Sequence, residues 1–134
     1  MTVFVDTSVW SLALRRDRPE PTPEVEFLAD RLQQGQPVIT TGLVLQELLQ
    51  GFHGARAREM ILERFASLPM LVPDRAAHVD AADLRSSCRR RGIQVGTIDA
   101  LLAALCTRHD LTMLTNDGDF DRMAEITPLR VWRP

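Results

Sequence analysis

The fold of this chain is decided near its amino terminus by the stretch Val3-Phe4-Val5-Asp6-Thr7-Ser8, VFVDTS. Thr2 to Val5 is rich in residues that favour strands. The next three residues, Asp6-Thr7-Ser8, are typical of a helix start, and we expect that helix to reach about Leu14. A buried strand that runs directly into a helix is the unit from which parallel sheets are built.

The same order of strand and helix recurs along the chain. Pro37 to Thr40 (PVIT) predicts a strand before a helix over about 42–50, and Leu111 to Thr115 (LTMLT) predicts a strand before a turn at 116–119. The other expected elements are helices over about 23–34, 55–67, 74–91 and 97–109 and strands at 70–72 and 129–132. This alternation favours an α/β fold, with three α/β/α layers around a mostly parallel sheet. No linker or repeat interrupts it, so we expect residues 1–134 to form a single domain.

Composition places the chain among ordinary globular proteins, since its 134 residues are 45% hydrophobic and 25% charged. No segment reaches the roughly 18 apolar residues that a membrane span needs. Residues 1–6 lack the basic and long apolar regions of a signal peptide, so we expect a cytoplasmic protein. Cys88 and Cys106 have neither C-x-x-C nor zinc-site spacing, and we expect two buried thiols.

Charge alone does not identify a nucleic-acid binder, because the net charge is −2. All 16 basic residues are Arg and none is Lys. Guanidinium groups fit phosphate oxygens well, whereas the missing lysine excludes the phosphate-binding loop of P-loop enzymes.

Four acidic residues lie just beyond predicted strands or in the first turns of predicted helices: Asp6, Glu47, Asp99 and Asp117. In an open parallel sheet such positions converge on one crevice at the carboxyl ends of the strands. Several carboxylates in one crevice repel each other, so we expect a cation among them. Oxygen ligands without a histidine at metal spacing favour Mg²⁺ or Mn²⁺ over Zn²⁺.

Each acid also has a plainer interpretation. Asp6 could be only a helix N-cap, Glu47 a solvated surface residue, and Asp117 part of an Asp-Gly turn. Asp99 could be satisfied by the N–H groups of its own helix, yet that helix is apolar nearly all round, and a buried charge there needs a partner. An EF-hand calcium loop starting at Asp117 is excluded, because its sixth residue is Arg122 and not glycine.

Taken together, these motifs resemble the PIN-domain ribonucleases, and most closely the VapC-type toxins of bacterial and archaeal toxin–antitoxin pairs. The resemblance covers essentially the whole chain in order. It is carried by residues 3–8 (VFVDTS), Glu47, Gly92, residues 98–104 (IDALLAA) and residues 114–120 (LTNDGDF).

The resemblance implies a Mg²⁺- or Mn²⁺-dependent endoribonuclease that leaves 3′-hydroxyl and 5′-phosphate ends. It assigns the catalytic and metal-binding roles to the four acids above, with Asp119 as a further metal ligand. It places supporting polar residues at Thr7, Ser8, Thr115 and Asn116. It also implies an RNA substrate, a homodimer and a small antitoxin partner whose tail enters the acidic crevice. Asp6 and Asp99 are expected to bind the metal first.

Two arginine clusters are candidates for RNA phosphate contact. Arg89, Arg90 and Arg91 end the predicted helix 74–91, and Arg15, Arg16 and Arg18 lie in the loop after the first helix. The alternative for Arg89 to Arg91 is a solvated helix end, where cations suit the helix dipole.

Two further classes of function stay open from the residues alone. One is a non-catalytic RNA- or protein-binding module on the same fold. The other is a receiver-type signalling domain, which also gathers acids at strand ends, although it uses paired early acids and a late lysine that this sequence lacks.

Overall fold

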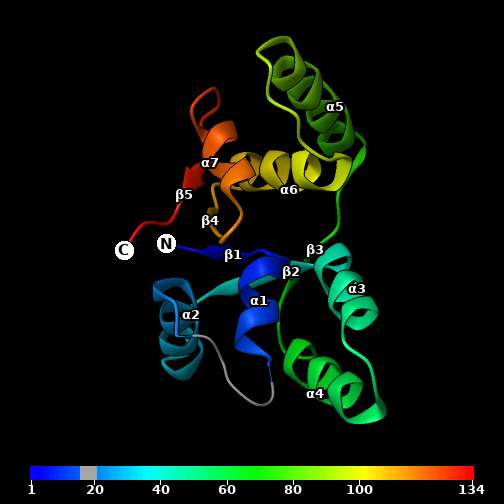
Figure 1. Ribbon diagram of the computed structural model, residues 1–134, viewed down its shortest axis with the longest axis vertical. Coiled ribbons are helices and arrows are strands. Elements are labelled where there is room, and N and C mark those ends of the chain that lie inside the picture. Colours follow the sequence, from blue (N-terminus) through cyan, green and yellow to red (C-terminus); the bar gives the residue numbers. More distant parts are fainter. Residues whose placement is uncertain (16–20) are drawn as a thin grey trace.

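The computed structural model describes residues 1–15 and 21–134, and a five-stranded sheet lies at its centre (Figure 1). All of its neighbouring strands are parallel, in the order β3-β2-β1-β4-β5. β1 pairs Val3 with Val38 on one side and Val5 with Leu114 on the other. The strands are β1 (Val3–Val5), β2 (Val38–Thr41), β3 (Met70–Leu71), β4 (Thr112–Leu114) and β5 (Arg130–Val131). The predicted parallel sheet is confirmed.

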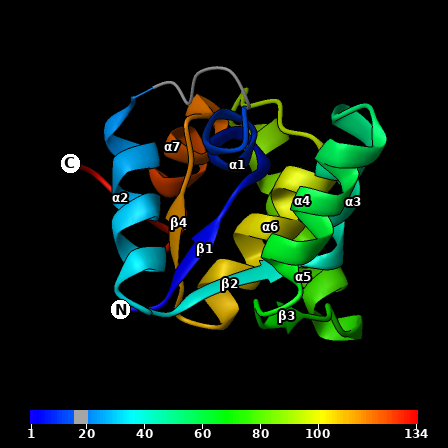
Figure 2. The ribbon, with the colours of Figure 1, turned by 90° about the horizontal axis from the view of Figure 1, so that it is seen from below.

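Helices cover both faces of this sheet, which gives the three predicted layers (Figure 1). On one face lie α1 (Thr7–Ala13), α2 (Pro23–Gln33), α3 (Gly42–Gly51) and α4 (Ala55–Phe65). On the other lie α5 (Arg75–Arg90), α6 (Thr97–Arg108) and α7 (Gly118–Ala124). Figure 2 shows β1 between β2 and β4 from a second direction.

Local chemistry explains where these helices begin and end. The Thr22 side chain accepts a hydrogen bond from the Val25 amide, and Pro23 occupies the first turn of α2. Asp74 caps α5 in the same way. Gly35 and Gly92 follow helix ends with φ of +66° and +76°, a conformation that glycine adopts without steric cost. The predicted helices before residue 110 are therefore confirmed to within about two residues.

The turn predicted at 116–119 is wrong in one respect, because α7 begins at Gly118. Asp117 is the N-cap of that helix, and its carboxylate accepts a hydrogen bond from the Asp119 amide. An Asp-Gly turn and an Asp-capped helix start the same way, and only the later residues distinguish them. Phe120 and Met123, three residues apart, are fully buried and hold the short helix on the core.

The core lies between the sheet and the helices, and the central strand and α6 contribute its least exposed residues. β1 is completely buried, and all residues from Ala100 to Cys106 in α6 are less than 10% exposed. Cys88 and Cys106 are free, buried thiols, as predicted. Within residues 1–15 and 21–134, no helix combines the length and apolar character needed to cross a membrane.

One buried cation joins α2 to the amino-terminal edge of the sheet. Arg31 is only 8% exposed, and its Nη2 donates hydrogen bonds to the carbonyl oxygens of Met1 (2.7 Å) and Pro37 (2.9 Å). Those carbonyls precede β1 and β2, so the guanidinium ties the starts of both strands to the end of α2.

Replacing Arg31 with Met keeps most of the apolar stem and removes these two hydrogen bonds. We expect Arg31→Met to lower the free energy of unfolding by about 2 kcal/mol, since two part-buried hydrogen bonds to a charged donor are lost. Urea denaturation followed by circular dichroism measures the change. Arg58→Met on the exposed side of α4 is the matched control and should change stability by less than about 0.5 kcal/mol. Equal effects of the two variants would contradict this role for Arg31.

Candidate active site

The candidate site lies where the chain leaves two neighbouring strands in opposite directions. After β1 the chain enters α1 on one face of the sheet, and after β4 it enters α7 on the other face (Figure 1). This is a topological switch point, where open α/β sheets form a crevice at the carboxyl ends of the strands. Asp6 follows β1 directly, and Thr115 to Asp117 follow β4.

Asp6 is held in this crevice by hydroxyl groups. It is 6% exposed, and its carboxylate accepts hydrogen bonds from the Ser8 amide (3.2 Å), the Ser8 hydroxyl (2.8 Å) and the Thr115 hydroxyl. The first of these is the N-cap contact of α1, so the cap interpretation of Asp6 is correct. The cap and a site role coexist, because the hydroxyl donors stabilise a charged carboxylate at the switch point.

The same hydroxyls also fix the loop after β4. The Ser8 Oγ accepts a hydrogen bond from the Asn116 amide, and the Thr115 Oγ1 accepts one from the Asp117 amide, both at 2.9 Å. Asn116 thus contributes its backbone N–H to this network. These contacts join the start of α1 to the start of α7 across more than 100 residues of sequence, and they orient Asp117.

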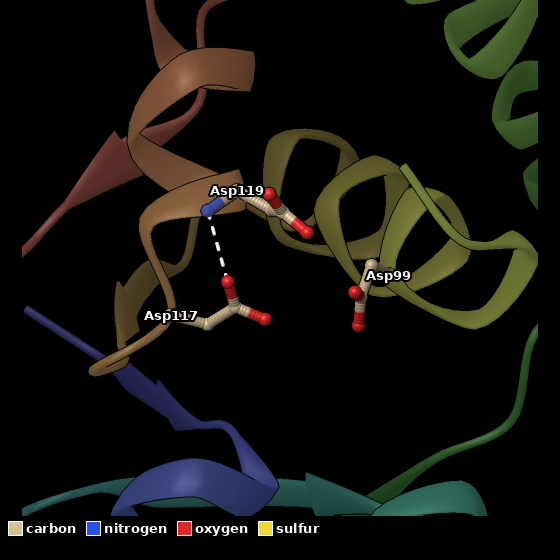
Figure 3. A group of neighbouring side chains, drawn as sticks. All are labelled: Asp99, Asp117 and Asp119. Atoms are coloured by element: carbon tan, nitrogen blue, oxygen red, sulfur yellow. Dashed lines mark hydrogen bonds between the residues drawn. The ribbon is translucent and has the colours of Figure 1, made fainter. Parts of the chain in front are cut away.

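Three carboxylates form a compact group that we call the acidic triad: Asp99, Asp117 and Asp119. One oxygen from each lies within 4.8 Å of the others. Asp99 comes from the first turn of α6, and the other two come from the start of α7 (Figure 3). Arg122 forms an ion pair with Asp119 one turn further along α7. A divalent cation with oxygen ligands suits such a group.

Glu47 approaches the site from α3 and is exposed. Its carboxylate accepts a hydrogen bond from the Thr7 hydroxyl at 3.0 Å. Glu47 and Asp6 lie outside the acidic triad, yet both are close enough to act on the charge of Asp99. All five predicted acids therefore gather in one region. Asp117 and Asp119 are the acids grouped with Asp99, whereas the sequence led us to expect Asp6 beside it.

Electrostatic strain is concentrated on Asp99. Burial, followed by the negative charges of Asp117, Asp6 and Glu47, raises the pKa of Asp99 to about 6. A carboxylate in this position favours any change that adds positive charge, whether a proton or a metal cation. The geometry can therefore concentrate a hard cation at the carboxyl ends of β1 and β4.

Sequence reasoning did not identify the Arg122 partner of Asp119. The three-residue spacing would have indicated this pair if a helix had been predicted over 118–124. Of the arginine candidates, Arg89 and Arg90 form the last turn of α5, and Arg91 is its C-cap. Arg15 lies just after α1, whereas Arg16 and Arg18 fall outside the described residues.

Comparison with known proteins agrees with this geometry. The family model of the PIN domain matches residues 3–126, so the chain is a PIN-domain protein. Ribonuclease VapC11 of Mycobacterium tuberculosis is 31% identical over 134 residues, which cover 96% of each protein. Ribonuclease VapC23 of the same species is 30% identical over 114 residues, or 84% of this chain and 89% of the relative. The chain thus belongs to the VapC group of PIN-domain proteins, and not to the receiver domains.

Solved structures show the same fold. FitAcB from Neisseria gonorrhoeae has a TM-score of 0.74 at 23% identity, over 99% of this chain and 98% of that one. VapBC2 from Rickettsia felis, bound to a DNA fragment from its promoter, has a TM-score of 0.77 at 19% identity, over 98% of each.

The pKa of Asp99 predicts how the metal-free protein responds to pH. A carboxyl that titrates near 6 when folded and near 4 when unfolded holds its proton more tightly in the fold, so stability falls as pH rises between those values. Asp99→Asn cannot ionise. In the presence of a chelator, we expect this variant to be more stable than the parent at pH 7 and the gain to shrink towards pH 4. Solvent screening of this half-buried group reduces the expected gain to about 2 kcal/mol.

Thermal unfolding at pH 4 to 8 measures this difference. Asp83→Asn, an exposed change on α5, is the control and should follow the parent at every pH. An Asp99→Asn protein that is no more stable than the parent at pH 7 would show that the acids do not strain the fold.

Proposed function

We propose that this chain is a metal-dependent endoribonuclease and the toxin of a toxin–antitoxin pair. The observation that carries the proposal is the acidic triad at the switch point of a PIN fold, with Asp6 and Glu47 beside it. Support also comes from relatives that are named ribonucleases over nearly the full length of the chain.

The donor set fits Mg²⁺ or Mn²⁺. Asp99, Asp117 and Asp119 would hold the ion, and Asp6 and Glu47 would complete the negative site. Such an ion, when bound, supplies Lewis acidity and a water that is reactive near neutral pH. Carboxylates without histidine or thiolate ligands are the usual choice for these hard cations.

The remaining polar residues hold the acids in place. Ser8 and Thr115 donate hydrogen bonds to Asp6 and hold its carboxylate in place, while Thr7 orients Glu47. Arg122 limits the movement of Asp119. These residues would act by positioning carboxylates, a supporting role that typically affects activity less than loss of the carboxylates themselves.

The proposal extends to partners and setting. The substrate is RNA, and the inhibitor is a small antitoxin protein, in line with solved relatives described as VapBC complexes. We further propose that residues 1–134 form one domain, that two copies form a homodimer, and that the protein works in the cytoplasm.

Incubation of the purified protein with mixed cellular RNA tests the catalytic proposal. Cleavage should require Mg²⁺ or Mn²⁺ and stop with a chelator. Asp99→Asn and Asp117→Asn should each reduce the rate by at least about 100-fold, because a metal site contributes several kcal/mol to the reaction. Asp83→Asn should cleave normally. RNA binding without turnover under any metal would instead indicate a non-catalytic PIN module.

The hydroxyl of Thr115 offers a second test. Thr115→Val removes the donor to Asp6 and the acceptor for the Asp117 amide while keeping the side-chain shape. We expect a rate loss of roughly 10- to 100-fold, typical of groups that orient metal ligands. Thr107→Val on α6 is the control, since its hydroxyl contacts only the Ala103 carbonyl. If the Thr115→Val variant cleaves RNA as fast as the parent, the Thr115 hydroxyl does not position the acids.

A further inference from the structure

We propose that a pocket between the end of α5 and the start of α6 binds a backbone phosphate of the RNA, beside the bond that is cut. The inference rests on the proposed function and adds to it a substrate-positioning site. We call this pocket the arginine pocket. It is lined by Arg85, Arg89, Ile93, Gln94, Val95 and Gly96.

The size and chemistry of the arginine pocket suit part of a nucleotide. Its volume is about 530 Å³, within the range of pockets that bind small ligands. Two guanidinium groups and one side-chain amide, that of Gln94, supply hydrogen-bond donors. Phosphate oxygens are the ligands that paired guanidinium groups recognise best.

Arg85 is already positioned for this role. Its Nε donates a hydrogen bond to the Val95 carbonyl oxygen at 3.0 Å, which fixes the guanidinium plane against the loop before α6. The terminal nitrogens Nη1 and Nη2 are left to bind a ligand. Arg89 lies four residues further along α5 and therefore on the same face of the helix.

No carboxylate of residues 1–15 or 21–134 forms an ion pair with the guanidinium of Arg85 or Arg89. By contrast, Arg108, Arg122, Arg130 and Arg133 each pair with a carboxylate. Two uncompensated positive charges in one pocket attract an anion.

The arginine pocket adjoins the acidic triad through Gly96. This residue lines the pocket and is also the N-cap of α6, three residues before Asp99. A Cβ atom placed on Gly96 would lie 4.0 Å from the Asp99 Oδ2. The φ of Gly96 is −73°, which any residue can adopt, so backbone strain does not require glycine there. Gly96 therefore brings the rim of the arginine pocket close to the Asp99 carboxylate.

A nuclease of this kind also needs positive charge near its acids. The RNA backbone is a polyanion, and the carboxylates around Asp99 repel it wherever a bound cation does not compensate. The arginine pocket places compensating charge at the edge of that acidic region. It therefore gives the strand a defined path past Asp99.

This site refines the predicted arginine cluster. Arg89 lines the pocket, whereas Arg90 and Arg91 do not, and Arg85 was not among the predicted residues. Arg75 provides a matched control, since it has the same charge and is exposed at the opposite end of α5.

Fluorescence anisotropy with a labelled single-stranded RNA, in chelator to prevent cleavage, tests binding directly. Arg85→Gln and Arg89→Gln should each raise Kd at least about fivefold, as expected for loss of a charged hydrogen bond. The double variant should reduce the slope of log K against log salt by about 0.7, since the pocket contacts one phosphate and each phosphate contact on a single strand contributes about 0.7. Arg75→Gln should stay within twofold of the parent.

Kinetics separate binding from distortion of the fold. Arg85→Gln also loses the contact to Val95, so thermal unfolding of each variant is measured alongside. Arg89→Gln has no such contact and should raise KM with little change in kcat. A normal KM with a lowered kcat in both variants would indicate disturbance of Asp99, and would overturn the pocket's role.

The outcomes also separate this inference from the proposed function. If the parent cleaves RNA but the Arg85 and Arg89 variants match Arg75→Gln in Kd and salt slope, the arginine pocket is rejected and the nuclease stands. If the parent cuts no RNA with any metal, yet binds it through Arg85 and Arg89, catalysis is rejected and the pocket stands. A parent that binds no RNA overturns the pocket.

Discussion

The hydrogen bonds that converge on Asp6 are the constraint on which the site depends. The hydroxyl groups of Ser8 and Thr115 each donate a hydrogen bond to the carboxylate. Each hydroxyl oxygen also accepts a hydrogen bond from a backbone amide in the loop after β4. One set of contacts therefore caps α1, joins the ends of two neighbouring strands and aims Asp117. Without it the crevice of the switch point would still exist, but Asp6 and Asp117 would lose the contacts that orient them.

Holding the carboxylates so close together lowers the stability of the fold, because their negative charges repel one another. The acids around Asp99 would separate if their backbones allowed it, and the rise in the pKa of Asp99 reflects that opposition. The rigid elements behind them prevent the separation: α6 is buried from Ala100 to Cys106, and Phe120 anchors α7. Functional sites commonly carry strain of this kind, and the surrounding core compensates for it.

Most of the fold could be predicted because local chemistry and tertiary structure agree. Thr22-Pro23 and Gly35 bound α2, and the apolar run after Asp99 indicates a buried helix, so neither needed information from distant residues. α7 was missed because its first turn matches an ordinary Asp-Gly turn. The grouping of Asp119 with Asp99 depended on that helix. The arginine pocket could not be predicted, since Arg85 on an amphipathic helix looks like any solvated residue until Val95 is seen beside it.

The wide separation of the bonded residues has a consequence for biosynthesis. The contacts between Ser8 or Asp6 and Thr115 join positions 107 and 109 residues apart. A nascent chain that has not yet exposed β4 and α7 lacks the partner of Asp6 and two acids of the triad. Contacts between residues so far apart in the sequence form slowly and late in folding. The acidic site therefore cannot assemble until the segment that contains β4 and α7 has been synthesised.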